Sequence, residues 1–345
     1  MTAMMMRGRR VAGLTLVLIA MLGRSPLARA AGCDVDVPRG GDIGAAIAAL
    51  PDDGHDMTIC LAAGEYRLRA FVPVTRDGVT LRGAGPRTVL RMQDGVAQPL
   101  IVVGDWRTEQ PAQPVRDVTI EKMKLIGGSA DHEFMPEHPY LSNSGIVVRR
   151  GENIALRDLE LDACRSACIL TERETRGVTI ERDKVVGAIW DGVSFNRSAQ
   201  ITLRDNEIRG NTAAGITAEH LEDSTISGNR ISGNGSHGIY LSDSLRNRVA
   251  DNRIEDNRHA GVFLTCAVRF RDPDPVLCWD NSLSQANVFE NNRFTRNEHG
   301  YDVGADRAAN CKLPQWQPNL WRNNRSDAPN RDPQPDLFGI CTRPG

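Results

Sequence analysis

Short alternating runs of apolar and polar residues fill the chain between residues 144 and 303. Each run starts at a small residue followed by a larger apolar one: Gly145-Ile146, Cys168-Ile169, Gly192-Val193, Gly215-Ile216, Gly238-Ile239, Gly261-Val262 and Gly300-Tyr301. The spacings between successive pairs are 23, 24, 23, 23, 23 and 39 residues. Within a run every second residue is apolar, as Ile239 and Leu241 illustrate. An alternation with period two predicts β-strands rather than helices.

Asparagine recurs in step with these strands. One series comprises Asn206, Asn229, Asn252 and Asn292, and a second comprises Asn211, Asn234, Asn257 and Asn297. A fixed period of this length indicates a repeat architecture in which each unit buries its apolar side against its neighbours. Glycine and asparagine tolerate a left-handed backbone at corners, and stacked asparagines can hydrogen-bond as ladders. The pattern therefore predicts an all-β fold, a single-stranded right-handed parallel β-helix with about 23 residues per coil.

The region before the repeats supports the same fold. The stretch DIGAAIAAL, residues 42–50, predicts a short N-terminal capping helix. Residues 57–90, MTICLAAGEYRLRAFVPVTRDGVTLRGAGPRTVL, follow it. This segment resembles the start of the pectate-lyase-like β-helix superfamily, which implies that the helix covers the open end of the coil. We expect the β-helix to run from about residue 57 to residue 326, inside a domain spanning 32–345 with a C-terminal cap at 311–345.

The first 31 residues have the pattern of a secretory signal peptide. Arg7, Arg9 and Arg10 precede an apolar run from Val11 to Leu22, which is too short to span a bilayer, and small residues follow in LARAAG. Cleavage after Ala30 or Ala31 predicts a periplasmic or secreted protein, with lipid anchoring at Cys33 as the alternative. Removal of five arginines and no acid lowers the formal net charge from −2 to −7. An acidic chain of this kind is a poor general nucleic-acid binder.

All eight cysteines follow the predicted cleavage site, an even number in a chain bound for an oxidising compartment. No pair of them has the spacing of a zinc site, so disulfides are the default interpretation. The predicted pairs are Cys33–Cys60, Cys164–Cys168, Cys266–Cys278 and Cys311–Cys341.

Candidate site residues follow from the strand frame. If Ile239 and Leu241 point inward, the residues that alternate with them point outward. The outward column four residues after each glycine position contains Arg149, Glu172, Asn196, Glu219, Ser242 and Thr265. We expect Asp191, Asn196, Glu219, His237 and Tyr240 to line one saccharide-binding face, with His237 and Tyr240 as catalytic base and acid. The alternative is that His237 occupies a polar turn and Tyr240 decorates the surface.

The string HGIYLS, residues 237–242, also stands where mannuronan C5-epimerases and related alginate-acting β-helices carry a Tyr-Gly-x-Asp-Pro-His run. His237 replaces the family's Tyr and Tyr240 replaces its Asp, so the resemblance implies the location of a groove. The run NRISGNGSHGIYLSDSLRNRVADNRIEDN resembles periplasmic β-helix proteins that assist copper-site maturation of nitrous oxide reductase. Scattered methionines disfavour a copper role here.

Two insertions are expected to flank this face. The first, residues 127–143, contains candidate metal ligands: Asp131, His132, Glu133, Glu137 and His138. A solvated polar loop would gather the same residue types. The second, residues 266–287, carries Arg269, Phe270, Arg271 and Trp279. These side chains suit either a wall that grips an anionic sugar chain or a cap folded over the coil edge.

The sequence thus predicts a carbohydrate-active protein, a polysaccharide lyase or epimerase acting on a uronate-containing polymer. We expect it to need no metal and no cofactor, and to bind an anionic polysaccharide rather than a nucleic acid. The alternative is a non-catalytic periplasmic protein of the polysaccharide-binding or maturation type. A structural or adhesive role is a third hypothesis. Fold alone does not separate these functions, since β-helices host many activities.

Overall fold

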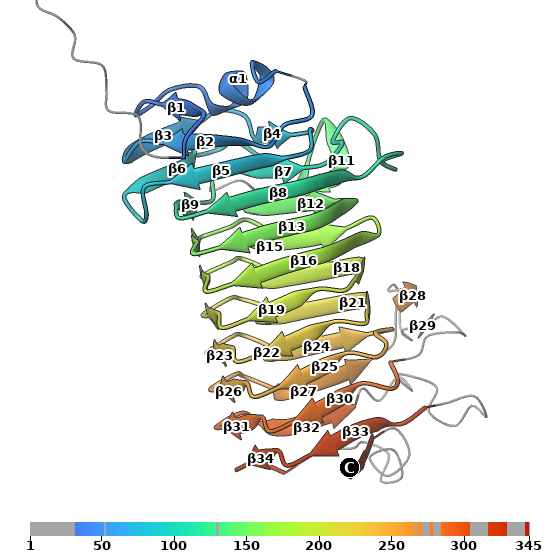
Figure 1. Ribbon diagram of the computed structural model, residues 1–345. Coiled ribbons are helices and arrows are strands. Elements are labelled where there is room, and N and C mark those ends of the chain that lie inside the picture. Colours follow the sequence, from blue (N-terminus) through green and yellow to red (C-terminus); the bar gives the residue numbers. More distant parts are fainter. Residues whose placement is uncertain are drawn as a thin grey trace, which may run out of the picture. The chain divides into compact units, whose positions relative to one another are not determined.

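Each sequence repeat forms one coil of three short strands, and equivalent strands of successive coils pair in parallel (Figure 1). The computed structural model describes residues 32–51, 53–128, 131–265, 268–270, 277–278, 284–303, 317–329 and 342–344. The predicted signal peptide lies outside these residues, as does most of the predicted C-terminal cap.

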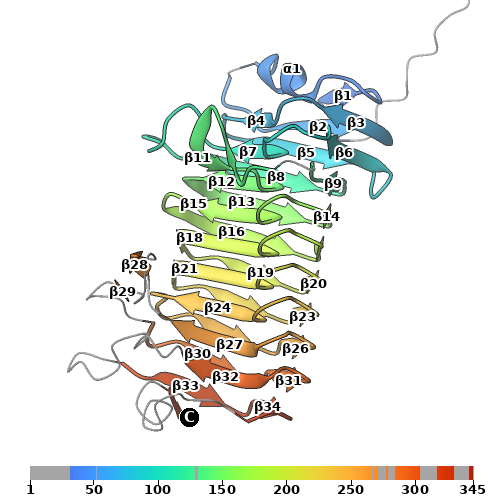
Figure 2. The same cartoon turned by 180° about the vertical axis from the view of Figure 1, so that it is seen from behind.

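The strands stack into three faces, seen from behind in Figure 2. The first face contains β4 (Val72–Val74), β7 (Ile101–Val103), β12 (Ile146–Arg149), β15 (Ile169–Glu172), β18 (Val193–Ala199), β21 (Ile216–Glu222), β24 (Ile239–Ser242), β27 (Ala260–Thr265) and β32 (His299–Val303). The second face contains β1 (Val35–Val37), β2 (Met57–Leu61), β5 (Val79–Gly83), β8 (Val115–Glu121), β13 (Gly151–Arg157), β16 (Thr175–Glu181), β19 (Thr202–Arg204), β22 (Thr225–Ser227), β25 (Arg248–Ala250), β30 (Val288–Glu290), β33 (Asn319–Arg322) and β35 (Thr342–Pro344).

The third face contains β3 (Gly64–Leu68), β6 (Thr88–Met92), β9 (Lys124–Ile126), β14 (Glu160–Asp162), β17 (Lys184–Val186), β20 (Glu207–Arg209), β23 (Arg230–Ser232), β26 (Arg253–Glu255), β31 (Arg293–Thr295) and β34 (Arg325–Ser326). Two short antiparallel pairs stand apart from the coils. They are β10 (Phe134–Met135) with β11 (His138–Ser142), and β28 (Val268–Phe270) with β29 (Leu277–Cys278).

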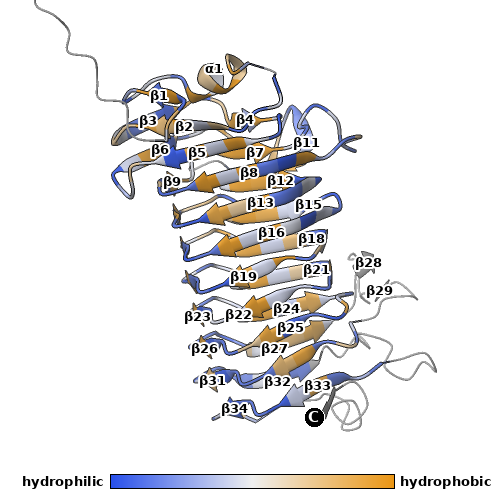
Figure 3. Ribbon diagram, viewed as in Figure 1, coloured by the Kyte–Doolittle hydropathy of each residue, from blue (hydrophilic) through white to orange (hydrophobic). Residues whose placement is uncertain are grey.

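The predicted inward column is confirmed. Ile239 is the Cα partner of Ile216 on one side and of Val262 on the other, and all three side chains are fully buried. In Figure 3 the strands carry much of the hydrophobic colour, while the turns at the left edge are hydrophilic. The glycine before each such strand is required by close packing. A Cβ on Gly238 would lie 2.5 Å from Cγ2 of Ile254.

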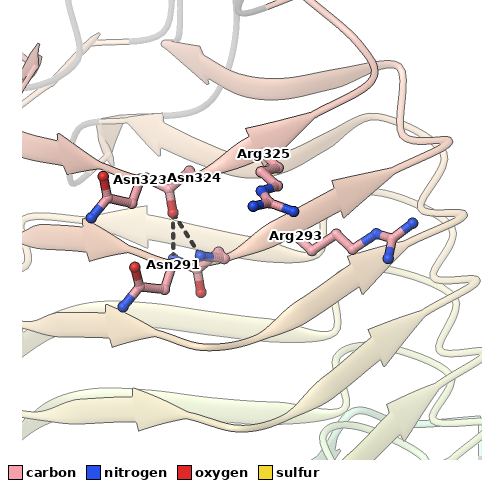
Figure 4. Close-up of a pocket in the computed structure, with 6 residues that line it drawn as sticks. Asn291, Arg293, Asn323, Asn324 and Arg325 are labelled. Carbon is pink, nitrogen blue, oxygen red and sulfur yellow. Dashed lines mark hydrogen bonds between the residues drawn. The ribbon is translucent and has the colours of Figure 1, made fainter.

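Both predicted asparagine ladders are present. Asn229 donates its side-chain amide to the carbonyl of Leu203 and to Oδ1 of Asn252, and its own Oδ1 accepts from the backbone and side-chain nitrogens of Asn206. Figure 4 shows a later step, in which Oδ1 of Asn324 accepts from Asn292. The left-handed residue of these corners is the one before each ladder asparagine: Asp205, Gly228, Asp251, Asn291 and Asn323. The ladder asparagines therefore serve as hydrogen-bonding groups rather than as left-handed residues.

Removing one rung tests the contribution of the ladder. The change Asn229→Ala leaves buried donors on Asn206 and the buried carbonyl of Leu203 without their partner, and each orphaned group costs about 1–3 kcal/mol. We expect the free energy of unfolding to fall by about 3 kcal/mol or more in urea titrations. Ser227→Ala, at a half-buried position in the same coil, should change it by less than about 0.5 kcal/mol. Equal effects of the two changes would contradict this role.

The N-terminal capping helix is confirmed as α1 (Ile43–Ala48). Asp42 precedes it, and its side chain accepts a hydrogen bond from the backbone N–H of Ala45, which satisfies one of the free donors at a helix start. Ile43 and Ile47 are buried in the same apolar core as the first coils. The helix thereby covers apolar side chains at this end of the coil.

Two predicted disulfides are confirmed. Cys33 is bonded to Cys60, which ties the N-terminal strand β1 to β2, and Cys164 is bonded to Cys168 within one turn. The other two predicted pairs, Cys266–Cys278 and Cys311–Cys341, fall on positions whose side chains lie outside the described part of the chain.

Candidate functional site

The first face is covered at its N-terminal end. Val102 and Val147 point away from the coil interior, yet both are fully buried, because the hairpin β10–β11 packs over them. The hairpin lies beside β7 and β12 in both Figure 1 and Figure 2. From β15 onward the corresponding outward side chains are half-buried: Leu170, Ser194, Thr217, Tyr240 and Phe263. The open part of the first face therefore begins at β15.

Arg149 belongs to this cover. Its Nε donates to Oε1 of Glu172 at 2.7 Å, and its guanidinium lies 5.1 Å from the ring centre of Tyr140. Its terminal nitrogens donate to loop carbonyls, those of Asp105, Thr108 and Glu109. The column faces outward as predicted, but three of its side chains are buried rather than exposed: Arg149, Ser242 and Thr265. Arg149 anchors a loop and cannot neutralise a substrate on the open face.

The hairpin does not assemble the metal site considered for residues 127–143. Its apolar residues Met135 and Leu141 pack against the coil, and Nδ1 of His138 is hydrogen-bonded to the hydroxyl of Tyr140 at 3.0 Å. Within the described residues the one group of ligand atoms close enough for a metal ion is formed by Cys33, Asp36 and Cys60. Its two cysteines are bonded to each other, so they offer no thiolate.

Asp191 was expected on the saccharide-binding face, and its carboxylate lies against the outward side chain of Ser194, but the residue is buried and offers no contact surface. Only 3% of the residue is exposed. One carboxylate oxygen accepts from the backbone N–H of Ala214 at 2.9 Å, and the other accepts from the hydroxyl of Ser194 at 3.2 Å. Asp191 therefore links two adjacent coils through hydrogen bonds. Burial raises the pKa of this carboxyl to about 6, against hydrogen bonds from Ala214 and Thr217 that lower it.

The raised pKa of Asp191 predicts a pH-dependent stability. Between about pH 4 and pH 6 the native state holds a proton that the unfolded chain has released, so the native state loses stability as the pH rises through this window. The loss amounts to roughly 3 kcal/mol at most. Asp191→Asn can keep the hydrogen bonds without the charge, so we expect it to be more stable than the wild type at pH 7 and to lack this loss. Urea titrations at pH 4.5 and pH 7 check the difference, and identical pH profiles would contradict the assignment.

Asn196 and Glu219 lie outward on adjacent coils, as predicted. They are Cα partners in β18 and β21, and the amide of Asn196 donates to Oε2 of Glu219 at 3.3 Å. Glu219 is exposed and Asn196 is half-buried. This pair presents a carboxylate and an amide to a ligand on the open face.

His237 stacks face to face on Phe263, with ring centres 4.3 Å apart. Its Nδ1 accepts the backbone N–H of Ala260 at 3.2 Å, so Nδ1 carries no proton. Burial and, to a smaller extent, the nearby His259 lower the pKa of His237 to about 4, against Glu298, which raises it. The neutral ring therefore carries its proton on Nε2. In this form His237 is a hydrogen-bond donor rather than a base.

The sequence analysis missed a second histidine beside it. The His259 ring centre is 5.5 Å from that of His237, and its Nδ1 lies 3.0 Å from Oε2 of Glu298. Because a carboxylate can only accept, the neutral ring of His259 carries its proton on Nδ1 and its lone pair on Nε2. Within the described residues no hydrogen bond occupies Nε2. The other oxygen of Glu298 lies 3.6 Å from Nε2 of His299.

His259 has the geometry of an oriented general base. A carboxylate holds one ring nitrogen and fixes the tautomer, which leaves the other nitrogen basic. Tyr240 lies one coil away, and the ring of His237 is near both side chains, with its centre 6.2 Å from that of Tyr240 and 5.5 Å from that of His259. Strand β24 and the turns that precede β27 and β32 thus bring imidazole, phenol and carboxylate groups to one region of the surface.

The sequence does contain a signal for His259, but in a different column from that of His237. His237 stands one residue before Gly238, whereas His259 stands two residues before Gly261. Glu298 occupies the same second position before Gly300, and backbone hydrogen bonds link these positions from coil to coil. The insertion between the two coils hides this correspondence in the sequence.

An exposed tryptophan was also missed. Trp190 occupies the same column as His259 three coils earlier, about 14 Å away at about 4.8 Å per coil. It is 48% exposed, and its carbonyl accepts the N–H of Ala213. It therefore offers an aromatic surface at the margin of the first face.

Three predicted contact residues on the second insertion cannot be placed. Arg271 and Trp279 lie outside the described residues, and only the backbone of Arg269 is described, in β28. Their predicted contact with substrate stays a prediction.

A separate cavity of about 650 Å³ lies among the corner asparagines of the last described coils (Figure 4). Arg293 and Arg325 line it together with Asn291 and Asn323. The two asparagines stand at the corner between the second and third faces, and the two arginines are on the third face. This cavity is therefore not part of the open first face.

Comparisons with known proteins agree with the fold. The family described as "Right handed beta helix region" matches residues 144–272. No curated protein sequence matches the chain. Within the described residues, no helix is long and apolar enough to cross a membrane.

Three solved structures illustrate the structural likeness. An alginate lyase from Paenibacillus sp. is 11% identical with a TM-score of 0.62, and the match covers 86% of this chain and 97% of that one. The catalytic domain of a GH87 α-1,3-glucanase is 12% identical with a TM-score of 0.52, covering 90% and 68%. The A-module of the mannuronan C-5 epimerase AlgE6 from Azotobacter vinelandii is 16% identical with a TM-score of 0.48, covering 88% and 94%. At such low identities the likeness to the lyase and the glucanase shows a right-handed β-helix fold and nothing finer.

Proposed function

We propose that this protein is a carbohydrate-active β-helix that binds a uronate-containing polysaccharide along its first face and acts on it as a lyase or epimerase. The observation that carries the proposal is the pair formed by His259 and Glu298, which holds an imidazole ready to accept a proton on an open face. The printed activities of the structural neighbours, an alginate lyase and a glucanase, support a polysaccharide as the ligand.

The first step is removal of the proton on the carbon next to the uronate carboxylate. Nε2 of His259 accepts this proton, and Glu298 stabilises the imidazolium that forms. In a lyase, the electron pair then forms a carbon–carbon double bond while the adjacent glycosidic carbon–oxygen bond breaks. The hydroxyl of Tyr240 donates a proton to the departing oxygen. In an epimerase, a proton returns to the same carbon from its opposite side and no bond in the chain breaks.

Binding groups line the same face on the coils that precede this centre. Nε2–H of His237 is a donor, while Asn196 and Glu219 offer donors and acceptors for hydroxyl groups. Trp190 offers a flat apolar surface on which a sugar ring can stack. Asp191 contributes indirectly, because it holds the backbone of the two coils between these groups.

A screen of uronate polymers tests the proposal. The mature protein should release unsaturated ends from alginate, pectate or a related polymer, read by ultraviolet absorbance, or invert its uronate residues, read by NMR. Binding without either change would support the alternative of a non-catalytic polysaccharide-binding protein. Absence of both binding and turnover on every uronate polymer would overturn the carbohydrate assignment.

We further propose that the protein is exported to the periplasm or secreted, with residues 1–31 removed. The bond between Cys33 and Cys60 favours a soluble product over a lipid-anchored one, because a disulfide-bonded sulfur has no thiol left to acylate. Cell fractionation followed by sequencing of the mature N-terminus tests this proposal. A cytosolic protein with an intact N-terminus would contradict it.

A further inference from the structure

A groove of about 390 Å³ runs along the turn between the first and second faces. It spans four successive coils, from β16 through β18 and β21 to the residue after β24. The side chains that matter for its charge are Glu174, Arg176, Arg197, His220, Glu222 and Asp243. None of them was singled out by the sequence analysis.

The repeat places three of these side chains in one column. Arg197, His220 and Asp243 follow the outward first-face residues Asn196, Glu219 and Ser242 directly in sequence. All three have a left-handed backbone, with φ between 46° and 55°. Because coils stack about 4.8 Å apart, the column brings an arginine, a histidine and an aspartate together at the edge of the first face.

Two carboxylates at the far end of the groove, those of Glu222 and Asp243, have side-chain partners within the protein. Nδ1 of His220 lies 2.8 Å from Oδ2 of Asp243, which leaves Nε2 of His220 without a hydrogen bond among the described residues. Oε2 of Glu222 is bound by Arg246 at 2.7 Å.

Two arginines remain. Arg176 and Arg197 are both exposed, and neither forms an ion pair within the part of the chain that the structure describes. Against them stands one exposed carboxylate, that of Glu174. The backbone N–H of Glu174 donates to the carbonyl of Arg197 at 2.8 Å, which fixes the two coils that carry the arginines. At the end of the groove formed by the coils of β16 and β18, two guanidinium groups therefore face one exposed carboxylate, and their planar donors match a carboxylate ligand, while the acidic Glu222 and Asp243 lie on the coils beyond.

We propose that this groove is a binding site for the carboxylate of an acidic saccharide unit, held by Arg176 and Arg197, with Nε2 of His220 facing a sugar hydroxyl. This inference rests on the proposed function, since the groove borders the Asn196–Glu219 edge of the first face and extends the polymer path beyond it. A neutral saccharide would leave both guanidinium groups without an anionic partner.

The first test uses a monosaccharide, so that it does not depend on turnover. Glucuronate should shift the Nε–H signals of Arg176 and Arg197 in an NMR titration of the full mature chain, while glucose should not. Arg197→Ala and Arg176→Ala should each weaken glucuronate binding by about tenfold. The control Arg87→Ala removes an exposed arginine between β5 and β6, away from the groove, and should change nothing.

The second test uses a uronate polymer that the wild type converts. Arg197→Ala and Arg176→Ala should raise KM about tenfold and leave kcat unchanged. If glucuronate shifts the arginine signals but the protein converts no polymer, the result would support the acidic-saccharide site and contradict the proposed enzymatic activity. Normal KM values in both variants, or sulfate shifting the arginines as strongly as glucuronate, would overturn the acidic-saccharide site while leaving the proposed enzyme intact.

Discussion

Replacing Ile239 by aspartate is expected to prevent stable folding of the β-helix. The side chain of Ile239 is fully buried between Ile216 and Val262 in the inward column of the first face. No cation lies in this column to pair with a carboxylate, and an unpaired buried charge is among the most destabilising changes a core can suffer. We expect the free energy of unfolding to fall by more than about 4 kcal/mol, measured by urea titration or seen as a large drop in melting temperature.

Gly233→Asp provides a matched control for the added charge. Gly233 lies six residues earlier on an exposed corner with φ of 62°, and a Cβ there would meet nothing within 4 Å. Aspartate tolerates this backbone better than most residues, so the change should be nearly neutral. A normal melting temperature for Ile239→Asp would show that the inward frame of the first face is wrong.

The second large effect concerns turnover. Once a polymer is found on which the wild type acts, His259→Gln should lower kcat by about 10²–10⁴, because the general base is lost. Tyr240→Phe should lower it on the same scale if the phenol supplies the proton. Tyr240 points outward on the first face and His259 stands at its margin, and both are half-buried, so the melting temperature should change little. Steady-state rates and thermal unfolding of each variant check these expectations.

His237 separates this mechanism from the one expected from sequence. If His237 only donates a hydrogen bond, His237→Gln keeps a donor and should cost less than tenfold in kcat. Glu298→Gln removes the partner of Nδ1 without removing the base, so it should shift the acid limb of the pH–rate profile as well as lower kcat. A larger loss for His237→Gln than for His259→Gln would restore the sequence-based assignment. Full activity of all these variants would move the site to another face.

Much of the fold could be predicted because each coil repeats the same local chemistry. The alternation of Ile239 and Leu241 specified strands, and the spacing of Asn206, Asn229 and Asn252 specified how these strands stack. The structure confirms both, together with the helix after Asp42 and the Cys33–Cys60 and Cys164–Cys168 bonds. Local signals were sufficient here, because a parallel solenoid places residues one period apart directly above each other.

The candidate site was predicted less well, because burial depends on what covers a coil rather than on the coil itself. Arg149 and Asp191 stand in columns that face outward by period, yet both are buried. The loop that precedes β8 covers the first, and the neighbouring coil takes up the second through Ala214. Glu219 also faces outward by this period, and it is exposed because none of the described residues packs over its coil.

The sequence by itself determined the strand period, the stacking register and therefore the solenoid, since these depend on residue spacings that recur along the chain. Only the tertiary structure decided which titratable groups meet. His259 and Glu298 are 39 residues apart, the interval between Gly261 and Gly300, so the sequence can place them in one column but does not show that their side chains meet. Pairing of β27 with β32 brings their side chains to 3.0 Å. The physical reason is that hydrogen bonding between coils joins strands that an insertion of any length can separate in sequence.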